Sequence, residues 1–268
     1  MTPLRAVALL GDQLRHRWYA TQLAEEPGIE LLGVVTERQP PQPVGATDEE
    51  DELVADHFAR RRDAEERHLG RAQDWDELGA PVLRVERGET NTERVADWVG
   101  GLGPDLLLLY GCGIVRAPLL DVYAGRAVNL HLGLSPYYRG NAANFWPLVN
   151  GEPECVGVTV HLATLEVDAG AILRQARPGM EPGDCSHDIG CKALVAGARA
   201  LLAALPAYAN SELQPVPQQP GGRVYRHADF EAASAASIAE LRRRFDAGMI
   251  PAYLEQKAER DARFPIVE

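Results

Sequence analysis

The stretch RAVALLGDQLRHRWYATQLAEEPGIELLGVV, residues 5–35, contains a β-strand, an α-helix and a second strand in close succession. Residues 5–11 form an apolar run of the kind found in a buried strand, and residues 29–35 form another. Between them, residues 14–26 carry the mixed polar and apolar side chains of a surface helix. This order predicts a βαβ unit, and therefore a mostly parallel sheet.

The alternation continues along the chain and predicts an α/β fold: a Rossmann-like, mostly parallel twisted sheet with flanking helices and a short C-terminal extension. The run LLLLY (106–110) suits a central strand covered on both faces. VGVTVHLA (156–163) alternates like an antiparallel edge strand, with 170–178 as its partner. We expect one domain over residues 1–205 and an extension over 206–268 with two short helices. Other strands are expected at 80–86, 105–111 and 125–131, other helices at 48–69, 91–102, from about 143 and at 184–205, and the two short helices at 237–248 and 250–260.

The composition is that of an ordinary globular protein. Of 268 residues, 46% are hydrophobic, which suffices for a sizeable core. The formal net charge of −12 works against binding to nucleic acid. We find no run of about 18 apolar residues and no secretion signal, so we expect a cytoplasmic protein without membrane contact. A homodimer is compatible with the sequence.

Neither a metal centre nor a standard nucleotide motif is predicted. The cysteines include no CxxC pair and no zinc-type spacing, so we expect free thiols and no metal. LLGDQLRHR (9–17) has one glycine where the dinucleotide fingerprint needs three, and only Glu37 stands near the position of a ribose-binding acid. No Walker A sequence is present, and the Pro-rich segment 38–46 interrupts the alternation.

A polar pair stands at the end of the strand expected at 125–131. Side chains alternate along a strand, so Asn129 and His131 point to the same side, roughly 7 Å apart. They lie at the carboxyl end, where open α/β sheets bind their ligands. An amide donor beside an imidazole suits a reaction in which a carbonyl oxygen gains negative charge. A structural hydrogen-bonding cluster is the alternative interpretation of this spacing.

Asp168 follows the predicted edge strand, in the turn VDAG. A carboxylate before Ala-Gly is also typical of an ordinary Asx-turn. Together with Asn129 and His131, however, it would complete a site with an oxyanion donor, an imidazole and a carboxylate that orients the imidazole or accepts a proton. We predict that Asp168 lies within about one hydrogen bond, direct or through one water, of the other two side chains.

Residues 129–173, NLHLGLSPYYRGNAANFWPLVNGEPECVGVTVHLATLEVDAGAIL, resemble the folate-dependent formyltransferase family. The family has Asn-x-His, a Leu-Pro-x-Tyr-x-Gly-like loop, and an Asp before Thr/Ala-Gly. Asn129, His131, SPYYRG and Asp168 match this pattern. Weaker likeness covers residues 1 to about 205. Gly133 and Ser135 depart from the Ser and Leu of many members.

The resemblance implies transfer of a formyl group from N10-formyltetrahydrofolate to a primary amine through a tetrahedral intermediate, without a metal. It implies that Asn129 binds the formyl oxygen, that His131 stabilises the oxyanion and relays the proton, and that Asp168 positions His131 or a water. It also places folate at LLLYGCGIVRAPLL, whose glycines allow close backbone approach. The expected folate contacts are Tyr110, Gly111, Gly113 and Ile114.

The expected acceptor is a small molecule, a nucleotide-linked amino sugar or another amine of specialised metabolism. The tail is shorter and less basic than the C-terminal domain of methionyl-tRNA formyltransferases, and GDQLRHRW lacks the phosphate loop of glycinamide ribonucleotide transformylases. Arginine suits phosphate and aromatic rings stack on rings. Candidate acceptor contacts are Arg15, Trp18, Tyr138, Arg139, Asn141 and Asn144, each with a purely structural role as the alternative.

Two other functions stay open. A formyltetrahydrofolate hydrolase would use the same three residues with water as acceptor, although such enzymes usually carry an amino-terminal regulatory domain and the first strand here begins within five residues of Met1. A non-catalytic folate- or metabolite-binding protein would need none of the three. Outside this set, we expect His161 to be solvated or hydrogen-bonded, His187 to be structural or exposed, and Cys112 not to act as a nucleophile.

Overall fold

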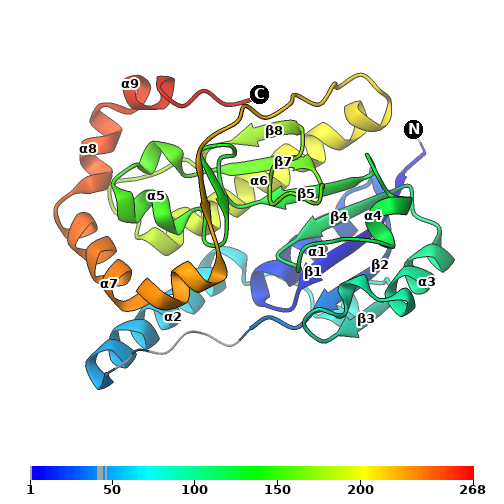
Figure 1. The fold of residues 1–268 in the computed structure, drawn as a ribbon, viewed down its shortest axis with the longest axis horizontal. Helices are drawn as coiled ribbons and strands as arrows, with labels where there is room; N and C mark the ends of the chain where they lie inside the picture. The colour runs from blue at the N-terminus through cyan, green and yellow to red at the C-terminus, as the bar shows by residue number, and fades with distance from the viewer. Residues whose placement is uncertain (1, 41–44, 46) are drawn as a thin grey trace.

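Seven strands form one twisted sheet in the order β3-β2-β1-β4-β5-β7-β8 (Figure 1). The structure is a computed structural model that describes residues 2–40, 45 and 47–268. β7 is antiparallel to its neighbours β5 and β8, and the first five strands in this order are parallel. The strands are β1 (Leu4–Gly11), β2 (Ile29–Glu37), β3 (Val82–Val85), β4 (Leu106–Tyr110), β5 (Ala127–His131), β7 (Val158–Leu162) and β8 (Ile172–Ala176). The predicted α/β fold with a mostly parallel sheet is confirmed.

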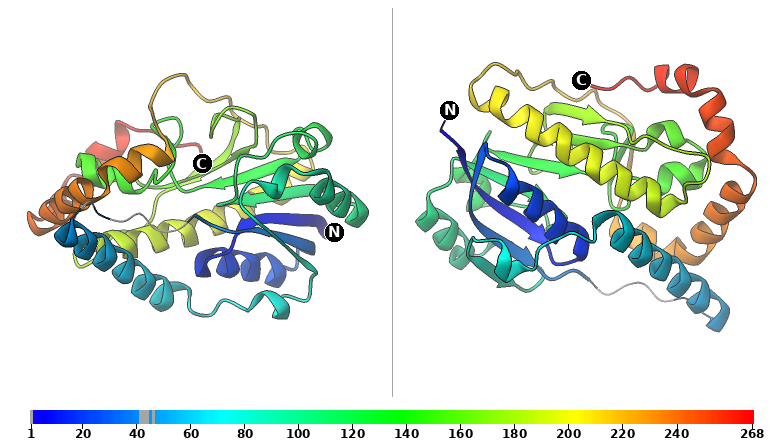
Figure 2. Two further views of the ribbon diagram at one scale, coloured as in Figure 1. Left: turned by 60° about the horizontal axis from the view of Figure 1, so that its bottom comes forward. Right: turned by 180° about the vertical axis from the view of Figure 1, so that it is seen from behind.

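Helices cover both faces of this sheet because its central strands are apolar on both sides. Ala8 and Leu10 of β1 pack with the helices α1 and α6, whereas Val7 and Leu9 pack with α3 and α4 on the opposite face. Figure 2 shows α1 and α6 on the same face of the sheet. The helices of this sandwich are α1 (Leu14–Glu25), α2 (Asp48–Leu69), α3 (Glu93–Leu102), α4 (Leu119–Val122) and α6 (Ser186–Ala209).

Helix α6 is long and apolar enough to cross a membrane by length and composition alone. In the structure, 56% of its most apolar window is buried inside the protein. Leu194, Ala198 and Leu201 pack against β7 and β8 in the largest core cluster. We therefore interpret α6 as a core helix.

The C-terminal extension differs from the expected tail with two short helices. Residues 206–268 contain the strand β9 (Arg223–Tyr225) and three helices, α7 (His227–Asp246), α8 (Met249–Glu255) and α9 (Lys257–Ala262). The Ala-rich run before Ile238 has high helix propensity, so α7 starts at His227, ten residues before the predicted start. The second predicted helix divides at Gln256.

This extension packs on the main domain through a core of its own. β9 pairs in parallel with β6 (Tyr138–Gly140), and α7 and α8 bury Leu241, Ile250 and Tyr253 against α5 (Phe145–Asn150). In the described residues, short 3-10 helices lie at Trp75–Glu77, Glu89–Asn91 and Pro153–Cys155.

The seven predicted strands lie within two residues of the observed ones, but β6 and β9 were not predicted. Both have three residues, too few for a periodic pattern to emerge. Within the Pro-rich segment 38–46, residues 41–44 and 46 lie outside the described residues.

Candidate active site

The site forms where β5 and β7 pair. The antiparallel register sets Asn129 opposite His161 and His131 opposite Thr159. All four side chains therefore stand on one face of the sheet, while Leu130 and Val160 point to α6 on the other. Asn129 and His131 are near the carboxyl end of β5, and α/β proteins bind ligands at the carboxyl ends of their parallel strands.

Asp168 enters this face from the turn after β7, and its side chain is 13% exposed. Its Oδ1 accepts a hydrogen bond from Asn129 Nδ2 at 3.3 Å, and its Oδ2 accepts one from the Gly140 N–H at 2.8 Å. His131 Nδ1 lies 3.3 Å from the same Oδ2. The predicted convergence of Asn129, His131 and Asp168 is thus observed as direct contact.

His161 belongs to the same cluster, which the sequence analysis did not predict. It is 2% exposed, and its Nδ1 is 2.8 Å from the carbonyl of Leu162. A carbonyl only accepts, so Nδ1 carries the proton and Nε2 accepts from Asn129 Nδ2 at 3.0 Å. Both N–H groups of the Asn129 amide are therefore engaged, one by His161 and one by Asp168. Pairing residues 125–131 with 156–163 in the sequence would have revealed this contact.

The electrostatics of the cluster favour an ionised carboxylate beside a histidine that loses its proton readily. Burial raises the pKa of the Asp168 carboxyl, but His131 and the Gly140 N–H act against burial, and that pKa lies well below its usual range. Burial lowers the pKa of His131, against the opposing effect of Asp168. His131 Nε2 lies 3.2 Å from the carbonyl of Tyr138, so a protonated ring would donate to an acceptor on each side.

The predicted folate residues lie one strand away, at the end of β4, where Gly111, Gly113 and Ile114 each have a bonded backbone group and the Tyr110 hydroxyl is buried without a partner in the described residues. Tyr110 is 4% exposed, and its ring packs in the core near His16. The Gly113 N–H donates to the buried Glu37 carboxylate at 2.5 Å. The Gly111 carbonyl accepts from Gln39 Nε2 at 2.9 Å. Of this set, only Ile114 presents a large exposed side chain.

Four of the six predicted acceptor contacts have structural partners instead. Arg15 forms an ion pair with Glu65 of α2 at 2.8 Å, and Trp18 is buried in the core. The Tyr138 hydroxyl bonds Glu152 and its ring is buried, while Asn144 Oδ1 accepts the Gly157 N–H at 2.9 Å. These side chains are recruited by packing, which single-sequence patterns do not reveal.

The other two predicted contacts, Arg139 and Asn141, remain at the edge of the site. Arg139 lies next to His131, and its Nε has no hydrogen-bond partner among the described residues. Its ion pair with Glu166, at 3.3 Å, involves a carboxylate that is 74% exposed. The Asn141 side chain makes no hydrogen bond to the described part of the chain, although its backbone N–H bonds Tyr225.

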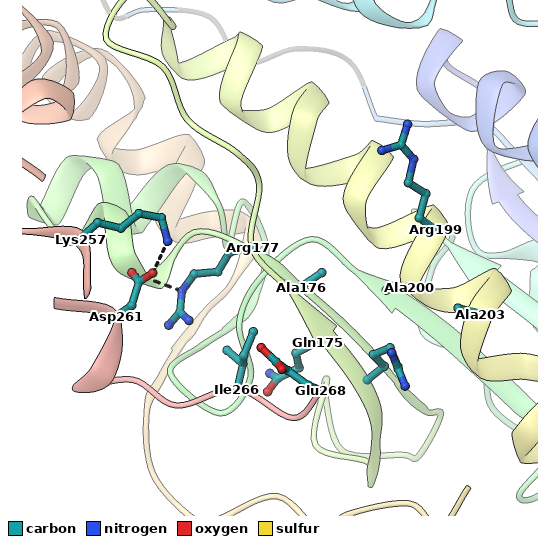
Figure 3. A pocket seen from close by; sticks show the side chains of 11 residues that line it. Gln175, Ala176, Arg177, Arg199, Ala200, Ala203, Lys257, Asp261, Ile266 and Glu268 are labelled. Carbon is teal, nitrogen blue, oxygen red and sulfur yellow. Dashed lines mark hydrogen bonds and ion pairs between the residues drawn. The ribbon is translucent and has the colours of Figure 1, made fainter. Parts of the chain in front are cut away.

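A cavity away from this cluster lies between β8, α6 and α9. It measures about 550 Å³. Figure 3 shows Lys257, Asp261 and Arg177 paired at one end and Arg199 at the other. Because its cations either pair with Asp261 or stand apart, we assign it no role in the site.

Thiol and metal chemistry find no support in the described residues. All four cysteines are free, and burial raises the pKa of Cys112 to about 12, which keeps this thiol protonated. Across residues 2–40, 45 and 47–268, no group of three His, Cys, Asp or Glu side chains is arranged to hold a metal ion.

Fold and site together define an α/β protein with a buried Asn-His-Asp cluster at the carboxyl edge of its sheet. The sequence profile of the formyl transferase family matches residues 17–205. The chain therefore belongs to the formyl transferase family, whose members are transferases.

Among curated relatives, methionyl-tRNA formyltransferase of Streptococcus pyogenes serotype M6 is 31% identical over 196 residues, which is 73% of this chain and 56% of the relative. The chain thus spans little more than half the length of the relatives it matches.

Solved structures share the fold. Phosphoribosylglycinamide formyltransferase from Anaplasma phagocytophilum superposes with a TM-score of 0.58 at 17% identity, over 84% of this chain and all of that one. A sugar N-formyltransferase from a Shewanella species gives 0.53 at 18% identity, over 85% and 79%. The formyltransferase PseJ from Anoxybacillus kamchatkensis, in complex with UDP-4,6-dideoxy-4-formamido-L-AltNAc and tetrahydrofolate, gives 0.52 at 16% identity, over 88% and 97%.

Proposed function

We propose that the protein transfers a formyl group from N10-formyltetrahydrofolate to the primary amine of a small molecule. The observation that carries this proposal is the contact of Asp168 with both Asn129 and His131, in a cluster where the His131 and Asp168 side chains are 8% and 13% exposed. An ionised carboxylate, an imidazole and an amide donor are the groups that acyl transfer to an amine requires. Membership of the formyl transferase family specifies the acyl group.

In the proposed reaction the acceptor nitrogen attacks the formyl carbon, and the carbonyl electrons move to oxygen. The resulting oxyanion accepts hydrogen bonds from Asn129 Nδ2 and from His131 Nε2, which gives up its contact with the Tyr138 carbonyl. The longer of the two Asn129 bonds, 3.3 Å to Asp168, is the one the formyl oxygen replaces. The amine proton passes to the His131–Asp168 pair. When the tetrahedral intermediate collapses, the bond to N10 breaks, and N10 takes a proton as tetrahydrofolate leaves.

The loop after β4 offers one feature that suits the pteridine ring of the donor, an exposed apolar side chain on a fixed backbone. Its backbone is held by Glu37 and by Asn91, whose amide donates to the Ile114 carbonyl at 2.8 Å. This leaves the 41% exposed Ile114 side chain as a fixed apolar contact for a ring. We propose that Ile114 contacts the pteridine and that the polar groups of Tyr110 and Gly113 do not.

The acceptor we propose is an amino sugar, most simply a nucleotide-linked one. The fold is shared with sugar N-formyltransferases, and the Arg139 guanidinium, whose charge acts on His131, suits an anionic or hydroxyl group of such a substrate. The curated relatives are named for a tRNA substrate, but a net charge of −12 disfavours RNA. A phosphate bound at the first βα turn would need the free backbone N–H groups at the start of α1. One of these, the Gln13 N–H, already donates to His16 Nδ1, so this turn is poorly suited to a phosphate.

A panel assay tests the function. Purified protein is incubated with N10-formyltetrahydrofolate and a set of nucleotide-linked amino sugars and small amines, and tetrahydrofolate release and product mass are followed. We expect one acceptor to gain the mass of one formyl group. His131→Ala abolishes this gain, whereas His227→Ala, at the start of α7, retains it. Tetrahydrofolate release without any acceptor would instead identify a hydrolase, and folate binding without release would identify a binding protein.

A further inference from the structure

The segment between α6 and α7 crosses the catalytic loops. We call residues 213–226 the strap. Val216 pairs with Ile172 of β8 through two backbone hydrogen bonds of 2.7 Å, and β9 pairs with β6. The strap, gold to orange in Figure 1, thus runs from the strand that follows the Asp168 turn to the strand that supplies the Gly140 N–H.

Gln218, in the middle of the strap, binds the Asp168 turn through its side chain. Its Nε2 donates to the carbonyl of Asp168 at 2.8 Å and to the carbonyl of Gly170 at 2.7 Å. Both N–H groups are used, so the orientation of the amide is defined by donor chemistry. Its Oε1 is buried without a hydrogen-bond partner in the described residues, a destabilising arrangement that the contact to the turn has to outweigh.

The Asp168 backbone needs such support. Its φ is +48°, in the left-handed region that residues with a Cβ rarely occupy, although Asp does so more often than most. Such a conformation persists only where the surroundings hold it, and Gln218 bonds the carbonyls on either side of Ala169. A relaxed turn would move the carboxylate away from His131 Nδ1.

The strap also fixes the donor to the other side of Asp168. The Asn141 N–H donates to the Tyr225 carbonyl at 2.8 Å, which holds Gly140 against β9. Gly140 has a φ of +84°, and its N–H reaches Asp168 Oδ2. Asp168 is therefore held from its backbone by Gln218 and from its side chain by a β6 amide that β9 supports.

We propose that Gln218 is a positioning residue for Asp168, and that the strap is a working part of the active site. Gln218 reaches no reacting atom. It holds the Asp168 turn in the one conformation that sets the carboxylate against His131 and Asn129. This inference deepens the proposed function and rests on it for its kinetic test.

Kinetics of Gln218→Ala and Gln218→Glu test this role, with the adjacent Gln219→Ala as the matched control. Gln219 is exposed and makes no hydrogen bond in the described chain. Loss of two hydrogen bonds to the turn predicts a fall in kcat of roughly tenfold for Gln218→Ala, with KM for folate and amine within about twofold. Gln218→Glu, which keeps the size but not the donors, falls at least as far. Gln219→Ala keeps the wild-type kcat.

A second readout does not depend on activity. The groups that face His131 are Asp168 from the turn, His161 from β7 and Arg139 from β6, and of these charged partners Asp168 raises the His131 pKa. When Gln218→Ala lets Asp168 move away, the midpoint of the His131 titration, followed by ¹⁵N NMR of labelled histidine, shifts down by roughly half a pH unit. The midpoint in Gln219→Ala stays at the wild-type value.

Opposite results are distinguishable. Wild-type kcat and an unchanged His131 midpoint in Gln218→Ala would overturn the inference, as would a loss confined to KM. If the wild-type protein transfers no formyl group to any amine, the proposed function fails, and the NMR titration alone decides the role of Gln218. If Gln218→Ala does not fold, Gln218→Glu and its titration decide in its place.

Discussion

Buried polar side chains lie at two neighbouring places along the carboxyl edge of the sheet, and the two groups differ in their hydrogen-bond partners. At the ends of β1 and β4, Glu37 accepts the N–H groups of Gly88 and Gly113, and His16 accepts the Gln13 N–H. These groups are matched to backbone partners. At the end of β5, Asn129, His131, His161 and Asp168 bond one another in addition to their backbone partners.

The difference teaches where chemistry is to be expected in this fold. The β1–β4 end is the reversal point of the strand order, the usual ligand crevice of α/β sheets. Here His16 packs so closely that a Cβ on Gly111 would lie 2.2 Å from its Nε2. Polar groups bonded to the backbone stabilise a loop, whereas side chains that bond one another can exchange a partner for substrate. This contrast is the reason we propose the catalytic machinery at the β5–β7 end.

The largest expected effect is on His131. His131→Ala removes both a donor to the oxyanion and a proton acceptor, so kcat/KM falls by about three orders of magnitude. Steady-state kinetics with the acceptor from the panel measure it, with His227→Ala as control. A His131→Ala variant whose kcat/KM stays within tenfold of wild type would show that His131 has no catalytic role. The β5 end would then not differ in function from the β1–β4 end.

Gly140→Ala sharpens the contrast by breaking the support of Asp168. A Cβ at Gly140 would lie 2.1 Å from the Tyr225 carbonyl oxygen, and its φ of +84° disfavours any side chain. We expect the free energy of unfolding to fall by about 3 kcal/mol. Denaturant unfolding measures this loss. Gly179→Ala, with open space around the new Cβ, is expected to change it little; equal losses in both variants would contradict the packing described for β6 and β9.

His16 provides the corresponding test at the β1–β4 end. Burial lowers its pKa to about 3 in the folded protein, against 6.5 for a free side chain. The folded state thus binds fewer protons than the unfolded state below pH 6.5, so stability falls as the pH drops from there. His16→Ala should reduce the loss of unfolding free energy between pH 7 and pH 5 by about 2 kcal/mol. Unfolding curves at both pH values check this, and the same pH dependence in variant and wild type would mean that His16 is not buried and neutral.

The smallest expected effect is at His161. His161→Leu leaves one N–H of Asn129 without its acceptor, so the amide is less well oriented and kcat falls roughly tenfold. His161→Gln, whose side-chain oxygen is an acceptor, is expected to retain more activity than His161→Leu. Parallel kinetics of the two variants separate hydrogen bonding from packing, and the reverse ranking would show that His161 acts by its shape alone.

The sequence predicted the sheet well because its strands are long apolar runs with clear boundaries. It also predicted that Asn129, His131 and Asp168 meet, because strand alternation and a recognised spacing both constrain them. It did not predict His161 or Gln218. The first depends on which two strands pair and in what register, and the second on a contact between residues 50 apart in the chain.

The predicted acceptor contacts show the converse error, in which residues predicted to bind a ligand have structural roles. Arg15, Trp18, Tyr138 and Asn144 are residue types that bind ligands, yet each is taken up by a neighbour from another element. Arg139 and Asn141, on and beside the three-residue strand β6, stay accessible to the site. The packing of α2, of the main core and of the loops around β6 decides which of these side chains are free.

A crystal structure with bound 5-formyltetrahydrofolate, a stable formyl-bearing analogue of the donor, tests the central claim most directly. We expect its pteridine to lie against Ile114 and its formyl group to point to the β5–β7 end, within hydrogen-bond reach of Asn129 or His131. An analogue bound in the cavity between β8 and α6, or with its formyl group directed away from Asn129, His131 and Asp168, would contradict the assignment of catalysis to this cluster.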